Sequence, residues 1–144
     1  MLIVPLVWWL RSRGSGQPAP YGAFALIMLP FLIDVTGNSL DLYDRVSWWD
    51  DANHFVNWIP LSLGLGLLLF TDIPKRWQQV VATMGLGAIL AIGWELGEWY
   101  TFIRHGTELA TAYEDTLGDE VLGTLGALVA GLILAYRPRA GWRA

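Results

Sequence analysis

Residues 47–71 read SWWDDANHFVNWIPLSLGLGLLLFT, a short polar segment followed by a long apolar one. After Asp51 the stretch contains no Asp, Glu, Lys or Arg, and its one remaining ionisable side chain is His54. An α-helix rises about 1.5 Å per residue, so about 20 apolar residues cross the hydrocarbon core of a bilayer. The stretch therefore predicts a transmembrane helix over 52–71 that begins beside two aspartates and a histidine.

The composition of the whole chain agrees with a membrane location. Of 144 residues, 54% are hydrophobic and only 15% are charged, whereas soluble domains carry about 25% charged residues. This length predicts a single integral-membrane domain over 1–144. The absence of cysteine excludes thiolate zinc sites, iron–sulfur clusters and disulfides. The basic residues form no patch that would predict a nucleic-acid partner.

Apolar runs of membrane-spanning length occur four times. They lie at 20–39, 52–71, 78–101 and 116–136, so the predicted fold is an all-α, polytopic membrane helical bundle with four transmembrane helices. Residues 1–10, MLIVPLVWWL, are too short to cross, and we expect a short interfacial helix with Trp8 and Trp9 at headgroup level. The arginines follow this run rather than precede it, which is unlike a signal peptide. Residues 11–19 are predicted to be a polar linker.

The positive charges are distributed unequally between the two sides of this bundle. Seven of the nine Lys and Arg residues fall on the side that holds both termini, namely Arg11, Arg13, Lys75, Arg76, Arg137, Arg139 and Arg143. Cytoplasmic loops carry an excess of Lys and Arg. We therefore predict a multi-pass protein of the cell membrane with both termini in the cytoplasm.

The acidic residues concentrate on the predicted outer side, at one end of three different spans. Residues three or four apart share a helix face, and this spacing joins Asp51 to His54, Glu95 to Glu98, and Asp115 to Asp119. Glu95 is the costly member, because it lies about 9 Å inside the end of its span. A carboxylate at that depth is disfavoured by several kcal/mol unless it is paired, hydrated or metal-bound.

This convergence predicts a polar site whose negative charge a divalent metal would offset; the alternative is that some carboxyl groups are protonated. One imidazole with several carboxylates suits Zn²⁺, Mn²⁺, Fe²⁺, Mg²⁺ or Ca²⁺. The candidate metal ligands are Asp51, His54, Glu95, Glu98, Asp115 and Asp119, and the candidate additional members are Asp50, Glu120 and Asp34.

Simpler roles stay open for several of these residues. His54 can be hydrogen-bonded to a carboxylate without any metal, and Asp50 or Asp51 can be the N-cap of its helix. Asp34 can pair with Arg45 or Arg104 instead of joining the site.

Aromatic and small residues predict how the helices sit and pack. An aromatic belt at the outer interface, or contact with a lipid-like ligand or a partner, is expected of Trp48, Trp49, Trp58, Trp94 and Trp99. Two stripes of small residues, which allow membrane helices to approach closely, are Gly93 with Gly97 and Gly123 with Ala127 and Gly131.

Three short motifs in order resemble those of a known family. They are Asp50-x-x-x-His54-Phe55, Trp94-Glu95-x-x-Glu98, and Asp115-Thr116-x-x-Asp119 followed by a small-residue helix. Together they resemble the YjdF-type bacterial inner-membrane proteins and, more distantly, VanZ-like proteins. The resemblance covers about residues 40–136 and implies a polytopic bundle of uncharacterised function in the bacterial inner membrane.

Three functions are compatible with this sequence. The first is a membrane metal site that acts on or binds a lipid-like ligand, with a divalent ion as cofactor. The second is a non-catalytic accessory subunit of a larger membrane complex, in which the polar cluster serves helix packing. The third is an ion or proton pathway, which is disfavoured because the cytoplasmic halves of the spans are almost wholly apolar. Membrane lipids, and in the second case other membrane subunits, are the expected partners.

Overall fold

The computed structural model describes residues 3–14, 16 and 18–138, and this part of the chain is all-α. Its short elements are α3 (Leu42–Arg45) and two 3-10 turns, η1 (Ile103–His105) and η2 (Thr107–Ala110). The longer helices are α1 (Ile3–Ser12), α2 (Tyr21–Ser39), α4 (Trp49–Leu69), α5 (Arg76–Thr101) and α6 (Ala112–Tyr136). The prediction of an all-α bundle is confirmed.

Four helices are long and apolar enough to cross a membrane: Tyr21–Ser39, Trp49–Leu69, Arg76–His105 and Ala112–Tyr136. Three of them begin earlier than the apolar runs predicted, α5 by two residues and α4 and α6 by about one turn. Helix α4 begins at Trp49 rather than at residue 52, and α6 begins at Ala112 rather than at residue 116. In both cases the added turn is acidic. Acidic side chains are favourable in the first turn of a helix, and a search for apolar runs leaves that turn out.

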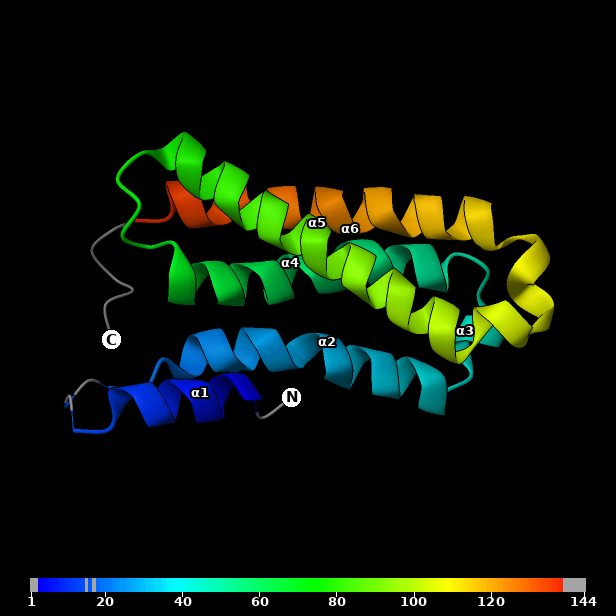
Figure 1. Ribbon diagram of the computed structural model, residues 1–144, viewed down its shortest axis with the longest axis horizontal. Coiled ribbons are helices and arrows are strands. Elements are labelled where there is room, and N and C mark those ends of the chain that lie inside the picture. The colour runs from blue at the N-terminus through cyan, green and yellow to red at the C-terminus, as the bar shows by residue number, and fades with distance from the viewer. Residues whose placement is uncertain (1–2, 15, 17, 139–144) are drawn as a thin grey trace.

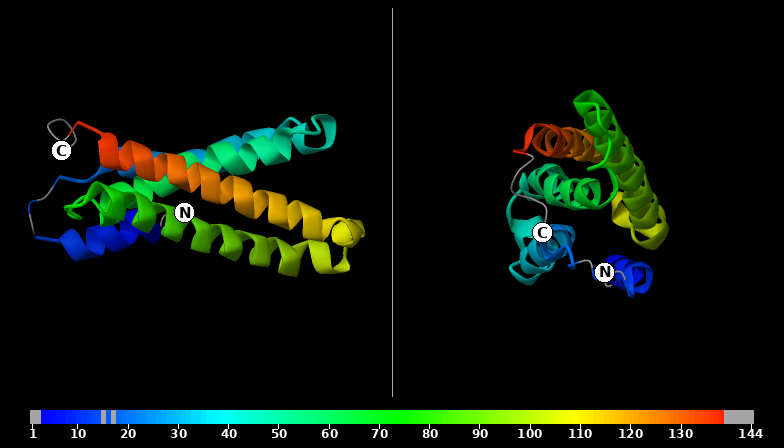
Figure 2. Two further views of the ribbon diagram at one scale, coloured as in Figure 1. Left: turned by 90° about the horizontal axis from the view of Figure 1, so that it is seen from above. Right: turned by 90° about the vertical axis from the view of Figure 1, so that its left-hand side faces the viewer.

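Helix α4 is the central element of the bundle. It packs against α2 on one side and against α6 and α5 on the other, and α6 also packs along α5 (Figures 1 and 2). Successive long helices run in opposite directions, so the start of α4, the end of α5 and the start of α6 meet at one end of the bundle (Figure 1). We call this the acidic end, and the opposite end, which holds the α4–α5 turn, the basic end.

Small residues on α6 allow α4 and α5 to approach α6 closely. A Cβ added at Gly126 would lie 2.5 Å from the Phe55 carbonyl oxygen, and one added at Gly123 would lie 2.9 Å from the Trp58 ring. Trp58 is 6% exposed, so it fills the space beside these glycines and lies in the core rather than in the predicted aromatic belt. The predicted α6 stripe is therefore a packing surface.

The predicted small-residue stripe of α5, Gly93 with Gly97, does not pack against another described helix. A Cβ added at Gly93 or Gly97 would meet no described atom within 4 Å, and both glycines are exposed. The glycine of α5 that packs is Gly87, against Ala127 and Ser62. The face of α5 that carries Gly93 is turned away from the rest of the described chain.

Helix α1 lies beside the first part of α2 and runs antiparallel to it (Figures 1 and 2). The rings of Trp8 and Phe24 meet edge to face, with centroids 5.9 Å apart. Helix α1 therefore runs alongside the bundle. None of its residues is buried against the protein.

Candidate functional site

The acidic end brings one histidine and four carboxylates together from three helices. His54 is in the second turn of α4, Glu95 and Glu98 are in the last two turns of α5, and Asp119 is in the second turn of α6. The antiparallel order of these helices places the four positions at one level. The fourth carboxylate, Asp50, precedes His54 by one turn on α4.

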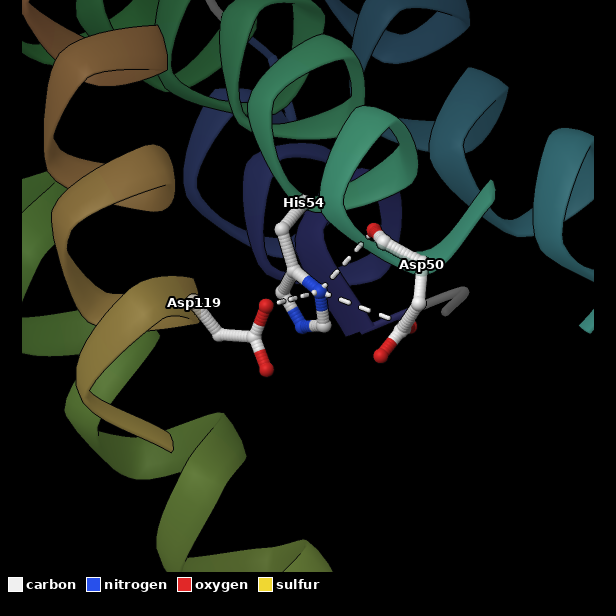
Figure 3. A group of neighbouring side chains, drawn as sticks. All are labelled: Asp50, His54 and Asp119. Atoms are coloured by element: carbon white, nitrogen blue, oxygen red, sulfur yellow. Dashed lines mark hydrogen bonds and ion pairs between the residues drawn. The ribbon is translucent and has the colours of Figure 1, made fainter. Parts of the chain in front are cut away.

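The His54 ring lies between carboxylates on its two sides. Its Nδ1 atom is 3.0 Å from Asp119 Oδ1, 3.6 Å from Asp50 Oδ1 and 3.2 Å from the Asp50 carbonyl oxygen (Figure 3). Its Nε2 atom is 3.5 Å from Glu95 Oε1. Three oxygen atoms surround Nδ1, which favours the tautomer with the proton on that atom. Nε2 then faces α5 with its lone pair.

The carboxylates around the ring are themselves held by neighbouring donors. Glu98 Oε1 accepts a hydrogen bond from Trp94 Nε1 at 2.9 Å, and Glu95 accepts one from the Thr116 side chain. Glu95 is 6% exposed and Asp119 is 3% exposed. Both are therefore withdrawn from solvent, at positions where an unpaired charge is costly.

Two overlapping sets of side chains have the spacing of a metal site. One comprises Asp50, His54 and Asp119, the other His54, Glu95 and Glu98, and within each set one ligand atom per residue lies within 4.8 Å of the others. His54 belongs to both sets. Within the described residues, the ion pairs of these carboxylates all involve His54, so even a protonated imidazole offsets one of four negative charges.

Of the six residues predicted as ligands, the structure brings four into these sets and leaves two outside. Asp51 is exposed and lies outside both sets; Asp50, expected as an additional member, lies beside the ring instead. Asp115 is exposed, one turn before Asp119, and also outside both sets. Neither aspartate of α4 is its N-cap, because that position is Trp48.

The two further candidates lie apart from the ring. Glu120 is half-buried and borders a groove between α5 and α6. Asp34 Oδ1 accepts a hydrogen bond from Tyr43 OH at 2.6 Å, so its partner is a tyrosine rather than Arg45 or Arg104.

Asp34 belongs to a second polar network that the sequence did not predict. The Asn53 side-chain amide donates to Tyr43 OH, and Asn57 Nδ2 donates to Asn53 Oδ1 at 2.6 Å. Burial, and then the hydrogen bond to Asp34, raise the pKa of Tyr43 well above its usual range. The network links α2, α3 and α4. Its sequence signal is the Asn53–Asn57 pair, four residues apart within an apolar run.

A groove between α5 and α6 opens beside the carboxylate cluster around His54. It has a volume of about 470 Å³ and is lined by Trp99, Leu109, Ala112, Tyr113, Thr116, Leu117 and Glu120. Thr116 thus lines the groove and also donates to Glu95.

Of the other predicted belt residues, Trp48 and Trp94 are exposed at this end, and the Trp49 ring packs edge-on to Tyr43 with centroids 6.4 Å apart.

Comparison with known proteins gives one family. The sequence model of the family described as predicted membrane protein (DUF2238) matches residues 1–140. No curated protein and no solved structure matches the chain.

Proposed function

This chain belongs to the DUF2238 family of predicted membrane proteins, and we propose that it binds a divalent metal ion at the acidic end of its membrane bundle. The observation that carries the proposal is the position of the His54 ring, with Nδ1 against Asp119 and Nε2 toward Glu95. An imidazole whose one nitrogen is fixed by a carboxylate is prepared to bind a metal through the other.

The residues that would hold the ion are His54, through Nε2, together with Glu95 and Glu98. Each already has a neighbour that orients it: Asp119 for the imidazole, Thr116 for Glu95 and Trp94 for Glu98. Outer hydrogen bonds of this kind tune metal affinity. One nitrogen and two carboxylates favour Zn²⁺, Mn²⁺ or Fe²⁺ over Mg²⁺ and Ca²⁺, which prefer ligand sets made of oxygen alone.

Charge balance supports a cation rather than a purely protein network. A protonated His54 would compensate only one of Asp50, Glu95, Glu98 and Asp119. Two of these carboxylates are buried, and buried charges are stable only when they are paired or coordinate metals. A divalent ion would supply the missing positive charge.

We also propose that this site lies on the outer side of a bacterial inner membrane, the membrane that the resemblance of the three motifs to YjdF-type proteins implies. The proposal rests on the basic residues at the opposite end, Arg11, Arg13, Lys75, Arg76 and Arg137, since cytoplasmic loops are rich in Lys and Arg.

The groove beside the cluster favours a lipid-like ligand for the metal. Its walls are mainly apolar, and Thr116 connects it to Glu95. The hydrocarbon part of an amphipathic molecule would lie along Trp99 and Leu117. A metal at the cluster would act as a Lewis acid on an oxygen atom of the head group.

The test is metal binding by the full chain purified in detergent and stripped with a chelator. Mn²⁺, Zn²⁺ and Ca²⁺ are titrated separately, and we expect tight binding of Mn²⁺ or Zn²⁺ that His54→Gln and Glu95→Gln abolish. Asp51→Asn is the matched control, because it removes an acid of α4 that lies outside both sets. Circular dichroism and gel filtration establish that each variant is folded.

The same experiment separates the metal site from an accessory-subunit role. If the wild-type chain binds no metal while Glu95→Gln loses its fold, the cluster serves helix packing and the metal proposal fails. If Asp51→Asn weakens binding as much as Glu95→Gln does, the ion is attracted by general negative charge, and the proposed ligand set is wrong.

A further inference from the structure

A second groove lies at the basic end, between α1 and α4. It has a volume of about 470 Å³, and its apolar walls include Val4, Val7 and Trp8 of α1 and Leu65 and Leu69 of α4. Arg11, in the last turn of α1, also lines it. This groove and the acidic cluster share no residue.

The groove runs from the end of the bundle toward its middle. Arg11 and Leu69 are near the chain ends of α1 and α4 that lie at the basic end, whereas Val4 and Leu65 lie a turn or more farther in. Ten helical residues extend about 15 Å, which is half of the roughly 30 Å hydrocarbon core. Helix α1 therefore has the length of one lipid leaflet.

Helix α1 needs hydrocarbon around it. Its apolar side chains remain exposed in the bundle, with Ile3 at 70%, Leu6 at 52% and Leu10 at 51%. The Trp8 ring touches Phe24 of α2, while the side toward α4 borders the groove. An apolar groove of this length beside such a helix suits the acyl chain of a lipid.

The charges at this end select the head group. Arg11, Arg13, Lys75, Arg76 and Arg137 lie here with a single acid of the described chain, Asp72. Among these basic residues only Arg11 lines the groove. The Arg13 guanidinium lies instead over the Trp9 ring, 3.5 Å from its centroid, and Trp9 does not line the groove. A basic side chain at headgroup level attracts anionic lipid.

We propose that the α1–α4 groove is a binding site for an anionic phospholipid of the leaflet at the basic end. One acyl chain lies along Val4, Val7 and Leu65, and the phosphate contacts Arg11. Helix α1 then docks onto the bundle through this lipid as well as through the Trp8–Phe24 contact. The site is independent of the proposed metal and of its ligands.

The experiment uses native mass spectrometry of the full chain in detergent, with phosphatidylglycerol and phosphatidylcholine of identical acyl chains as the two probes. We expect wild-type protein to retain phosphatidylglycerol preferentially. Arg11→Gln should reduce that retention about fivefold, the equivalent of about 1 kcal/mol for one basic residue near a membrane surface, and leave phosphatidylcholine unchanged. Val7→Trp, which fills the groove from α1 without touching the bundle core, should lower retention of both lipids.

Arg13→Gln is the matched control, since it removes the same charge just after the end of the same helix, outside the groove. An equal loss in Arg13→Gln and Arg11→Gln would mean diffuse attraction and overturn the site, as would equal retention of the two lipids by the wild-type chain. A wild-type dimer that Val7→Trp converts to a monomer would show a second copy in the groove, which also contradicts the proposal.

Discussion

His54 Nδ1 and Asp119 Oδ1 lie 3.0 Å apart and join α4 to α6 across the acidic end of the bundle. This contact decides which nitrogen of the imidazole ring is free. With Nδ1 engaged by Asp119 and by the Asp50 carbonyl oxygen, Nε2 is left toward Glu95. The contact therefore sets the direction in which a metal can be bound, without Asp119 itself being a ligand.

Asp119→Asn is expected to weaken metal binding by about 10- to 100-fold, the usual effect of losing an outer carboxylate partner of a metal-binding histidine. The asparagine Oδ1 atom still accepts a hydrogen bond, so the ring should keep its orientation but become a poorer donor to the metal. Calorimetric titration measures the affinity. Asp115→Asn, one turn away on α6 and outside both sets, should bind as the wild type does. Unchanged affinity in Asp119→Asn would show that Nδ1 needs no carboxylate.

Trp94→Phe should reduce metal affinity by less than tenfold, because it removes the indole N–H that holds Glu98 Oε1 at 2.9 Å and leaves the carboxylate in place. Trp94 is 44% exposed, so thermal stability should change little. Trp99→Phe, an equal change five residues later on the same helix, is the control and should leave the affinity unaltered. Equal affinities for Trp94→Phe and the wild type would mean that Glu98 is oriented by another group, or is no ligand.

Metal should also stabilise the fold. Saturation at about 100 times the dissociation constant is expected to raise the free energy of unfolding by about 2.7 kcal/mol, seen as a higher Tm that returns to its starting value on chelation. Glu95→Gln should show no such shift. A Tm that rises equally in the wild type and in Glu95→Gln would place the stabilising ion elsewhere.

The helices were largely predictable from the sequence because hydropathy reports them directly, and Glu95 was identified because a carboxylate so far inside a span needs a partner. The choice between Asp50 and Asp51 was not predictable, since both lie within one turn of His54 and only the placement of α6 selects Asp50. The prediction that Trp58 lies in the aromatic belt is wrong for a similar reason. Its burial depends on the glycines of α6, and spacing along α4 carries no information about them.

Gly126→Ala should lower the free energy of unfolding by about 1–3 kcal/mol, the usual range for overpacking. Its Cβ would lie 2.5 Å from the Phe55 carbonyl oxygen, a backbone atom that moves only if α4 and α6 separate. Gly118→Ala on the same helix meets no described atom within 4 Å, and replacing a helical glycine by alanine should stabilise by up to about 1 kcal/mol. Thermal unfolding in detergent compares the two, and equal effects would contradict the close α4–α6 packing.

The contribution of Tyr43 to the free energy of unfolding should fall at high pH. Burial and its hydrogen bond to Asp34 raise its pKa, so above about pH 10 the unfolded chain loses the phenolic proton while the folded chain retains it. The stabilisation from Tyr43 is therefore complete below pH 10 and declines as pH rises toward the folded-state pKa. Tyr43→Phe should cost about 1–3 kcal/mol at neutral pH by leaving Asp34 and Asn53 without this partner. The stability difference between the two proteins should then shrink above pH 10. A stability difference between the two proteins that stays constant across that range would show that the Tyr43 hydroxyl is not held by the folded bundle.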